Sequence, residues 1–277
     1  MKKSFFAIIF TMTMLQTSAQ QTLQKSGFAP VNGLSMYYEI HGSGRPLVLL
    51  HGGGSTIGTT FGRILPVLAK KYMIIAVESQ AHGHTPDINR PLTFEQDADN
   101  VFALLKELEI DNADVLGFSN GGSIAMQLAI RHPERVGKLI VVSSFFKRAG
   151  IYPEVWNFIK GGSLETMPKQ LKDAYLAINN DHNALKAMHD KDQQRMVDFK
   201  DWPEETIRSI KAQTLLVIGD KDVVSPEHAV EMYRLIPNCR LSIIPGGHGE
   251  FLGEITGWKE GDKMPGVFVE MVEEFLK

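Results

Sequence analysis

The five residues from 117 to 121 constrain the fold of this chain more than any other segment. They read Gly-Phe-Ser-Asn-Gly, include the last two residues of the apolar segment Asp114–Phe118, and precede a segment rich in small residues. A serine between glycines at this spacing is typical of a nucleophile elbow, a sharp turn from strand to helix that exposes the serine hydroxyl above a sheet. Glycines two residues before and after the serine permit the tight bend. Ser119 is therefore the candidate nucleophile.

Apolar segments alternate with helical patterns along most of the chain, and this alternation predicts the fold class. Short continuous apolar runs indicate strands buried on both faces. We expect strands at 34–40, 46–50, 73–77, 114–118, 138–143, 214–218 and 240–245, and helices near 59–71, 93–108, 122–132, 225–235 and 267–276. Residues 20–30 are expected to be a polar lead-in, followed by a hairpin turn at 31–33 and antiparallel edge-strand pairing at this end of the chain. The pattern predicts an α/β fold with a mostly parallel, doubly wound sheet of about eight strands.

The interval Ser144–Lys211 interrupts this alternation. It is rich in Met, Trp, Lys and Asp, and it has helical stretches without a clear strand. We interpret 144–211 as a helical insertion into a core that 20–143 and 212–277 form together.

The first residues have the three-part pattern of a secretory signal. Lys2 and Lys3 precede the apolar segment Phe5–Leu15, which is followed by the small residues Thr17–Ala19. We predict that 1–19 is a signal peptide and that the protein is secreted or periplasmic; an uncleaved amphipathic anchor is the alternative. No later segment of the sequence reaches the roughly 18 apolar residues that a membrane helix needs, so no membrane insertion is expected after the signal is removed.

Charge and cysteine content exclude other classes of protein. The formal net charge is −3 and no basic stripe occurs, so we expect no nucleic-acid partner. Cys239 is the single cysteine, which excludes an intramolecular disulfide. We interpret its thiol as structural.

A serine nucleophile needs a histidine base, and the chain contains nine histidines. Catalytic groups gather at the carboxyl ends of parallel strands, and only His51, His82, His84 and His248 follow predicted strands. The order serine, acid, histidine along the chain leaves His248.

The acid that orients this histidine should lie between Ser119 and His248. Asp220 and Asp222 both follow the strand 214–218. We favour Asp222, because it lies beyond the turn and can reach across to His248, whereas Asp220 is placed to fix its own loop. Glu227 and Glu250 are weaker candidates.

Acyl transfer also needs donors for the developing oxyanion. The backbone N–H of Asn120, directly after the serine, is the first candidate. The run His51-Gly52-Gly53-Gly54 follows a predicted strand and allows close backbone approach. We predict Gly53 N–H as the second donor.

Other side chains have two interpretations each. Phe145, Phe146 and Trp156 could line an apolar acyl pocket or form the core of the insertion. Lys147 and Arg148 could bind a substrate carboxylate, although a solvated basic pair is the favoured reading.

His82 and His84 are too few to indicate a metal site without companion ligands. We predict neither a metal nor another cofactor.

These motifs together resemble the α/β-hydrolase superfamily from about Val31 to the C-terminus. The segment GFSNGGSIAMQLAIRHPERV from Gly117 is similar to the capped branch that contains carboxylesterases, enol-lactonases, carbon–carbon bond hydrolases and proline iminopeptidases. This resemblance implies that the insertion 144–211 is the helical cap of that branch. The loop ESQAHGHTPD from Glu78 resembles the family's D-x-R-G-H-G-x-S but differs at Glu78, Gln80, Ala81 and Thr85. A serine at 119 also separates the chain from the superfamily's dehalogenases and epoxide hydrolases, which use an aspartate there.

The sequence therefore predicts a serine hydrolase that cleaves an ester or lactone of a small, apolar substrate. One alternative is the same triad acting on a carbon–carbon or N-terminal peptide bond, since one fold and triad host several chemistries. The other is a slow or non-catalytic receptor that binds a ligand in the capped pocket.

Overall fold

An eight-stranded sheet forms the centre of the protein, which is described by a computed structural model over residues 23–277; the predicted signal segment lies outside these residues. The strand order is β1-β2-β4-β3-β5-β6-β7-β8, with β2 antiparallel to β1 and β4 and the other pairs parallel. The strands are β1 (Leu23–Val31), β2 (Leu34–His41), β3 (Arg45–Leu50), β4 (Tyr72–Val77), β5 (Ala113–Phe118), β6 (Val136–Val142), β7 (Gln213–Gly219) and β8 (Cys239–Ile244). The predicted α/β class is confirmed.

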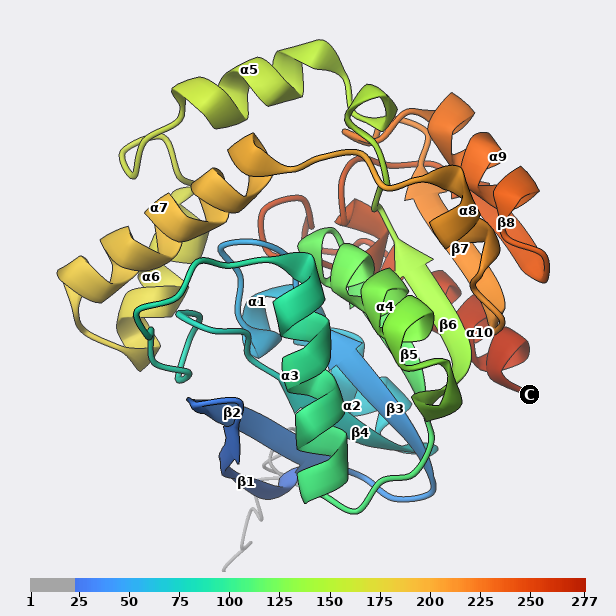
Figure 1. Cartoon of the computed structure of the whole chain (residues 1–277), viewed down its shortest axis with the longest axis horizontal. Helices are drawn as coiled ribbons and strands as arrows, with labels where there is room; N and C mark the ends of the chain where they lie inside the picture. Colours follow the sequence, from blue (N-terminus) through green and yellow to red (C-terminus); the bar gives the residue numbers. More distant parts are fainter. Residues whose placement is uncertain (1–22) are drawn as a thin grey trace, which may run out of the picture.

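Helices cover both faces of the sheet (Figure 1). They are α1 (Ile57–Phe61), α2 (Leu65–Leu68), α3 (Phe94–Glu107), α4 (Asn120–Arg131), α5 (Pro153–Gly161), α6 (Lys169–Ile178), α7 (His182–Asp198), α8 (Glu204–Arg208), α9 (Pro226–Leu235) and α10 (Met264–Leu276). Val48 and Leu50 of β3 pack into a core with α3, α4 and α9, whereas Leu47 and Leu49 pack into a second core with α1, α2 and α10. Because successive residues of a strand face opposite sides, burial of both faces explains the continuous apolar runs.

The sheet brings the loops after β3 and β5 together. β4 lies on one side of β3 and β5 lies on the other. Successive strands are therefore added on opposite sides of β3, and the strand order reverses at this point. Ligands of open α/β sheets bind outside the carboxyl ends of the strands at such a switch point. The residues after Leu50 and Phe118 therefore lie where a site is expected.

Two helices begin at the predicted capping residues. The Thr93 hydroxyl accepts a hydrogen bond from Gln96 N before α3, and the Ser225 hydroxyl accepts one from His228 N before α9. Pro226 is the first residue of α9, where its missing N–H costs nothing. Both predicted helix starts are confirmed.

Two predicted elements differ from the structure. The helix expected over 59–71 is two short helices, because Pro66 has no N–H to continue the backbone ladder and α2 restarts around it. The expected lead-in 20–30 is strand β1 over its described part, which pairs with β2 through a turn at Asn32 (φ 49°) and Gly33 (φ 80°). Antiparallel pairing with a neighbour overrides the polar composition of this segment.

The interval between β6 and β7 holds the helices α5 to α8. In Figure 1, α5 to α7 lie on the side of the strands' carboxyl ends, whereas α8 lies beside α9. Trp202 N donates a hydrogen bond to Phe146 O, 2.9 Å away, and ties the end of this interval back to its start. Within residues 23–277, no helix is both long enough and apolar enough to span a bilayer.

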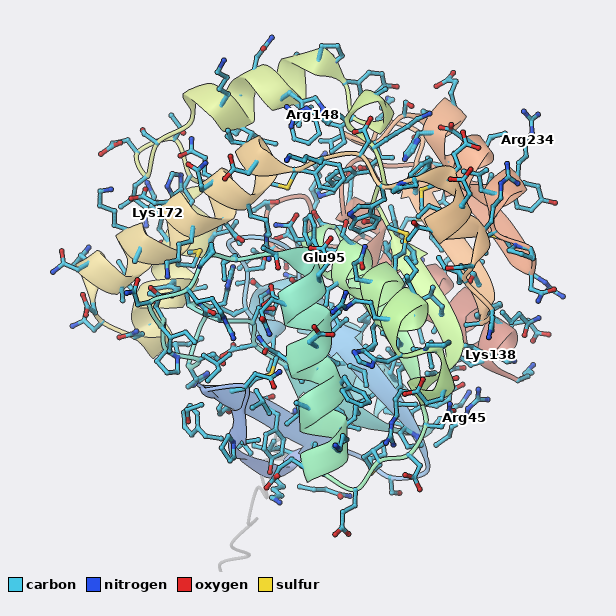
Figure 2. The ribbon with its side chains drawn as sticks, in the orientation of Figure 1. Arg45, Glu95, Lys138, Arg148, Lys172 and Arg234 are labelled. Atoms are coloured by element: carbon cyan, nitrogen blue, oxygen red, sulfur yellow. The ribbon has the colours of Figure 1, made fainter. Side chains whose placement is uncertain are left out.

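Basic side chains stabilise the end of α10. Arg45 donates to Leu276 O (2.8 Å) and Lys138 donates to Phe275 O (2.8 Å). Figure 2 shows both side chains on the side of the molecule where the chain ends. Positive charge near the last carbonyls of a helix complements its dipole.

Replacing Gly121 by Ala should strongly destabilise the protein. A Cβ at Gly121 would lie 2.0 Å from Leu50 O, which is rigid backbone of β3. We expect urea denaturation to show a free energy of unfolding lower by about 3 kcal/mol or more. The control is Gly266→Ala in α10, where nothing lies within 4 Å; it should raise the free energy of unfolding by about 0.5–1 kcal/mol. Equal stabilities of the two variants would contradict this account.

Candidate active site

Ser119 occupies a strained turn between β5 and α4. Its backbone angles are φ 54° and ψ −120°, in a region that costs a residue with a side chain on the order of 1–3 kcal/mol. Ser119 N donates to Val142 O of the neighbouring strand, 2.8 Å away. A Cβ at Gly117 would lie 2.1 Å from Gly121 O, so glycine is required for the bend. The surrounding backbone thus holds the hydroxyl in a fixed position.

The structure brings together the three side chains that sequence analysis singled out. His248 Nε2 lies 3.0 Å from Ser119 Oγ, and His248 Nδ1 lies 2.7 Å from Asp222 Oδ1. The three residues follow β5, β7 and β8, so their separation along the chain disappears at one edge of the sheet. A serine, a histidine and a carboxylate in this order can transfer a proton away from the serine.

Asp222 is held in place by donors other than His248. It is only 5% exposed. Its Oδ2 accepts from Ser143 Oγ (2.5 Å) and Gly219 N (3.2 Å), and its Oδ1 accepts from Val223 N (2.7 Å). Burial raises the pKa of Asp222, but the charge of His248 and these hydrogen bonds outweigh burial and lower the pKa below its ordinary value. Ser143, which sequence analysis missed, directly follows β6 and connects the end of this strand to Asp222.

The pKa of His248 is raised above the ordinary value of a histidine side chain. Burial lowers its pKa, but the charge and hydrogen bond of Asp222 outweigh burial, so the pKa is raised. The second candidate acid, Asp220, is exposed and accepts instead from Gly246 N, 2.9 Å away. This contact fixes its own loop.

The loop that carries the predicted donor Gly53 lies against Asn120 and Ser119. A Cβ at Gly53 would lie 2.4 Å from Asn120 Nδ2, and a Cβ at Gly52 would lie 3.4 Å from Ser119 Cβ. Within residues 23–277, the Gly53 N–H has no hydrogen-bond acceptor. The next N–H, of Gly54, donates to Asp192 Oδ2 (2.6 Å). The Gly53 N–H is therefore free to bind a ligand next to the serine.

A pocket of about 220 Å³ opens beside these donors. Helices of the interval between β6 and β7 supply most of its wall, which is lined by Gly53, Gly54, Asn120, Phe158, Ile159, Gly162, Thr166, Met167, Pro168, Leu171, Met188, His189, Asp192, Gln193 and Met196. Sequence analysis missed most of these residues. The spacing of Met188, Asp192 and Met196 places them on one face of α7 and could have indicated that face.

The aromatic residues predicted to line the pocket lie elsewhere. Phe145 and Phe146 are 3% and 1% exposed and belong to the core that α3 and α4 form with the sheet. Trp156 packs edge-on against Phe145, with ring centroids 5.8 Å apart. None of the three lines the pocket beside Gly53 and Asn120. Their burial favours the core interpretation.

The basic pair after β6 also makes internal contacts. Lys147 forms an ion pair with Glu231, and the Arg148 guanidinium lies 4.0 Å from the Trp156 ring centre. Neither residue lines the pocket beside the donors.

His82 and His84 bind different carboxylates. His82 Nε2 lies 2.8 Å from Asp192 Oδ2, and His84 Nδ1 lies 2.9 Å from Glu78 Oε2. Among residues 23–277, no group of three His, Cys, Asp or Glu side chains is arranged to hold a metal ion. Glu78, a departure from the family's loop motif, also accepts from His84 N (2.6 Å) and so orders the loop.

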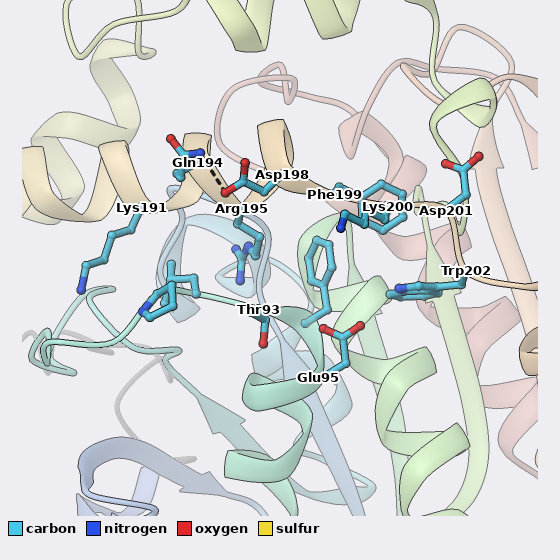
Figure 3. Close-up of a pocket in the computed structure, with 13 residues that line it drawn as sticks. Thr93, Glu95, Lys191, Gln194, Arg195, Asp198, Phe199, Lys200, Asp201 and Trp202 are labelled. Carbon is cyan, nitrogen blue, oxygen red and sulfur yellow. Dashed lines mark hydrogen bonds between the residues drawn. The ribbon is translucent and has the colours of Figure 1, made fainter.

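A larger cavity of about 480 Å³ lies along α7, between the end of that helix and the start of α3 (Figure 3). Phe94, Phe199 and Trp202 are among its lining residues, and Arg195 extends from α7 toward it. None of its lining residues is Ser119, His248 or Asp222.

Comparison with known proteins identifies a family match over half of the chain. The family described as "alpha/beta hydrolase fold" matches residues 45–183. The chain is 31% identical to the 2-hydroxymuconate semialdehyde hydrolase of Pseudomonas sp. (strain CF600), over 67% of this chain and 73% of that protein. It is 30% identical to the pimeloyl-[acyl-carrier protein] methyl ester esterase of Aliivibrio salmonicida over 56% of each. The solved enol-lactonase of Burkholderia xenovorans LB400 is similar in fold, with a TM-score of 0.69, 23% identity, and coverage of 90% of this chain and 99% of that one.

Replacing Asp222 by Asn should lower the pKa of His248. The carboxylate is what outweighs burial, so its removal leaves burial dominant and the neutral ring favoured. NMR titration of the ring protons should give a pKa above about 6.5 in the unmodified protein and below it in Asp222→Asn. The signal is identified by its loss in His248→Gln. Asp220→Asn should leave the pKa of His248 unchanged, and an equal shift in both variants would refute the pairing.

Proposed function

The chain belongs to the alpha/beta hydrolase fold family, and from this premise we propose that it is a serine hydrolase acting on a carboxylic ester or lactone of a small substrate. The main support for this proposal is the continuous set of contacts from Asp222 through His248 to Ser119, next to the free Gly53 N–H. This combination of nucleophile, base, orienting acid and adjacent donors supports acyl transfer.

In the acylation step, Ser119 Oγ attacks the carbonyl carbon while His248 Nε2 takes the hydroxyl proton. The carbonyl oxygen becomes an oxyanion that accepts hydrogen bonds from Gly53 N–H and Asn120 N–H. His248 then gives the proton to the leaving alkoxide oxygen, which departs as the alcohol. Asp222 keeps the ring in the correct tautomer and stabilises the imidazolium.

Water completes the reaction by the same route. His248 takes a proton from the water, whose oxygen attacks the acyl carbon. The second tetrahedral intermediate collapses, the proton returns to Ser119 Oγ, and the carboxylic acid is released. No cofactor takes part in this scheme.

The pocket beside the donors supports an uncharged acyl group. Its wall is rich in Met, Leu, Ile and Phe side chains, and neither Lys nor Arg is among its lining residues. A carboxylate buried there would lose its hydration without gaining a Lys or Arg partner. The name of the curated relative from Pseudomonas denotes a muconate, which carries a carboxylate. We therefore favour a neutral ester or lactone over such a substrate.

The alternatives use the same pocket. Cleavage of a carbon–carbon or N-terminal peptide bond would need the same triad with a different leaving group. A slow ligand receptor would keep the pocket without fast turnover. The free oxyanion donor favours catalysis over simple binding, because a receptor has no need for it.

The proposal also assigns a role to the interval 144–211 and a location to the protein. The interval 144–211 would act as the cap that determines which substrates reach Ser119. The signal pattern in 1–19 supports a secreted or periplasmic enzyme.

Hydrolysis of two p-nitrophenyl esters of matched length tests the proposal. We expect kcat/KM for p-nitrophenyl butyrate to exceed that for mono-p-nitrophenyl succinate by at least about tenfold, because the terminal carboxylate would be buried without a partner. Ser119→Ala should abolish hydrolysis. Asp222→Asn should lower kcat by about 10⁴-fold, whereas Asp220→Asn should cost far less.

Three results would contradict the proposal. One is a folded protein that hydrolyses no neutral ester or lactone. Another is activity that survives Ser119→Ala. Faster cleavage of a diketone or of an aminoacyl amide than of any ester would favour the alternatives.

A further inference from the structure

Asp192 joins the helix α7 to the loop that carries the predicted oxyanion donor. It is only 8% exposed. Its Oδ2 accepts from Gly54 N at 2.6 Å and lies 2.8 Å from His82 Nε2. Gly54 is 138 residues away along the chain, so this contact exists only when α7 is docked on the sheet.

The contacts of His82 favour its protonated form. Its Nδ1 lies 2.9 Å from Gln80 O and its Nε2 lies 2.8 Å from Asp192 Oδ2, and both oxygens are acceptors. A ring that carries a proton on each nitrogen can donate to both oxygens, and Gly54 N lies 3.3 Å from Nε2 as well. Burial lowers the pKa of His82, but the charge and hydrogen bond of Asp192 outweigh burial and raise it.

A second cation holds the other oxygen of Asp192. Arg195 Nη2 donates to Asp192 Oδ1, and Arg195 Nη1 donates to Asp97 Oδ2 of α3 at 2.8 Å. Asp97 and Arg195 are 2% and 6% exposed. The line of paired side chains thus runs from Asp97 of α3 through Arg195 and Asp192 of α7 to Gly54. Paired and hydrogen-bonded charges of this kind are fixed in position because the loss of one partner is costly.

Anchoring Gly54 N also restricts Gly53. The Gly54 N–H belongs to the peptide unit that follows Gly53, so its orientation limits the rotation of Gly53. Neither glycine has a side chain that could pack and hold the loop. The 2.6 Å bond to Asp192 supplies the missing restraint.

We propose that Asp192 is a positioning residue that fixes the loop Gly52–Gly54 so that the Gly53 N–H faces the developing oxyanion. Docking of α7 and assembly of the oxyanion site are then one event. The inference rests on the proposed serine hydrolase function. It predicts a defect in the stabilisation of the transition state, with substrate binding unchanged.

Asp192→Asn tests this role, with Asp97→Asn as the matched control. Both variants remove one carboxylate from Arg195, but only Asp192 touches the loop. Loss of a whole oxyanion donor costs about 10²–10³ in rate, so a loosened donor should lower kcat by about 10–100-fold in Asp192→Asn, with KM within threefold. The affinity for a trifluoromethyl ketone, whose adduct is a tetrahedral oxyanion, should fall by the same factor as kcat/KM. Asp97→Asn should lower the melting temperature while keeping kcat within threefold.

Two results would overturn the inference: a folded Asp192→Asn variant with unchanged kcat, or equal losses of kcat in both variants. If Asp192→Asn does not fold, His82→Gln replaces it, because the amide can still donate to Asp192 but carries no charge. It should lower kcat several-fold with KM unchanged, and an unchanged kcat would overturn the proposal. An unmodified protein with no esterase activity would instead contradict the proposed function.

Discussion

The close approach of backbone at the end of β5 is the constraint on which the rest of the site depends. Ser119 has a positive φ of 54°, and the glycines at 117 and 121 leave no room for a Cβ against Gly121 O and Leu50 O. The strain at the serine is offset by the parallel pairing of β5 with β3 and β6, which fixes both sides of the turn. A serine hydroxyl held in this way has a defined position relative to residues on other strands.

The pairing of buried carboxylates with donors and cations then fixes the positions of the residues around Ser119. Asp222 is buried but is bound by Ser143, Gly219 and His248, so its charge is retained in the interior. Asp192 is buried in the same manner between His82 and Arg195. Each carboxylate restrains a different part of the proposed machinery: the first orients the base, and the second restrains the loop with the free N–H. Both depend on charges that would be costly to leave unpaired.

The sequence was sufficient to predict the strands, two helix starts and the candidate catalytic residues, because these depend on local residue patterns or on the general geometry of a parallel sheet. The apolar runs predicted the strands, and Thr93 and Ser225 predicted two helix starts. The glycine–serine–glycine motif selected Ser119, and placement after strands together with chain order selected Asp222 and His248, which the structure brings together with it.

Contacts between distant segments were not accessible in this way. Asp192 has no sequence signal for its bond to Gly54, the pocket wall depends on how α5 to α7 pack, and the burial of Phe145 and Phe146 follows from the core between helices and sheet. The break in the helix expected over 59–71 was visible at Pro66, but the apolar composition around it concealed the boundary.

The most direct measurement of the central claim is a crystal structure of the protein after reaction with a fluorophosphonate. The account predicts a phosphorus atom bonded to Ser119 Oγ, with the phosphoryl oxygen about 2.7–3.1 Å from both Gly53 N and Asn120 N. An adduct on another residue, or a phosphoryl oxygen that touches neither N–H, would contradict it.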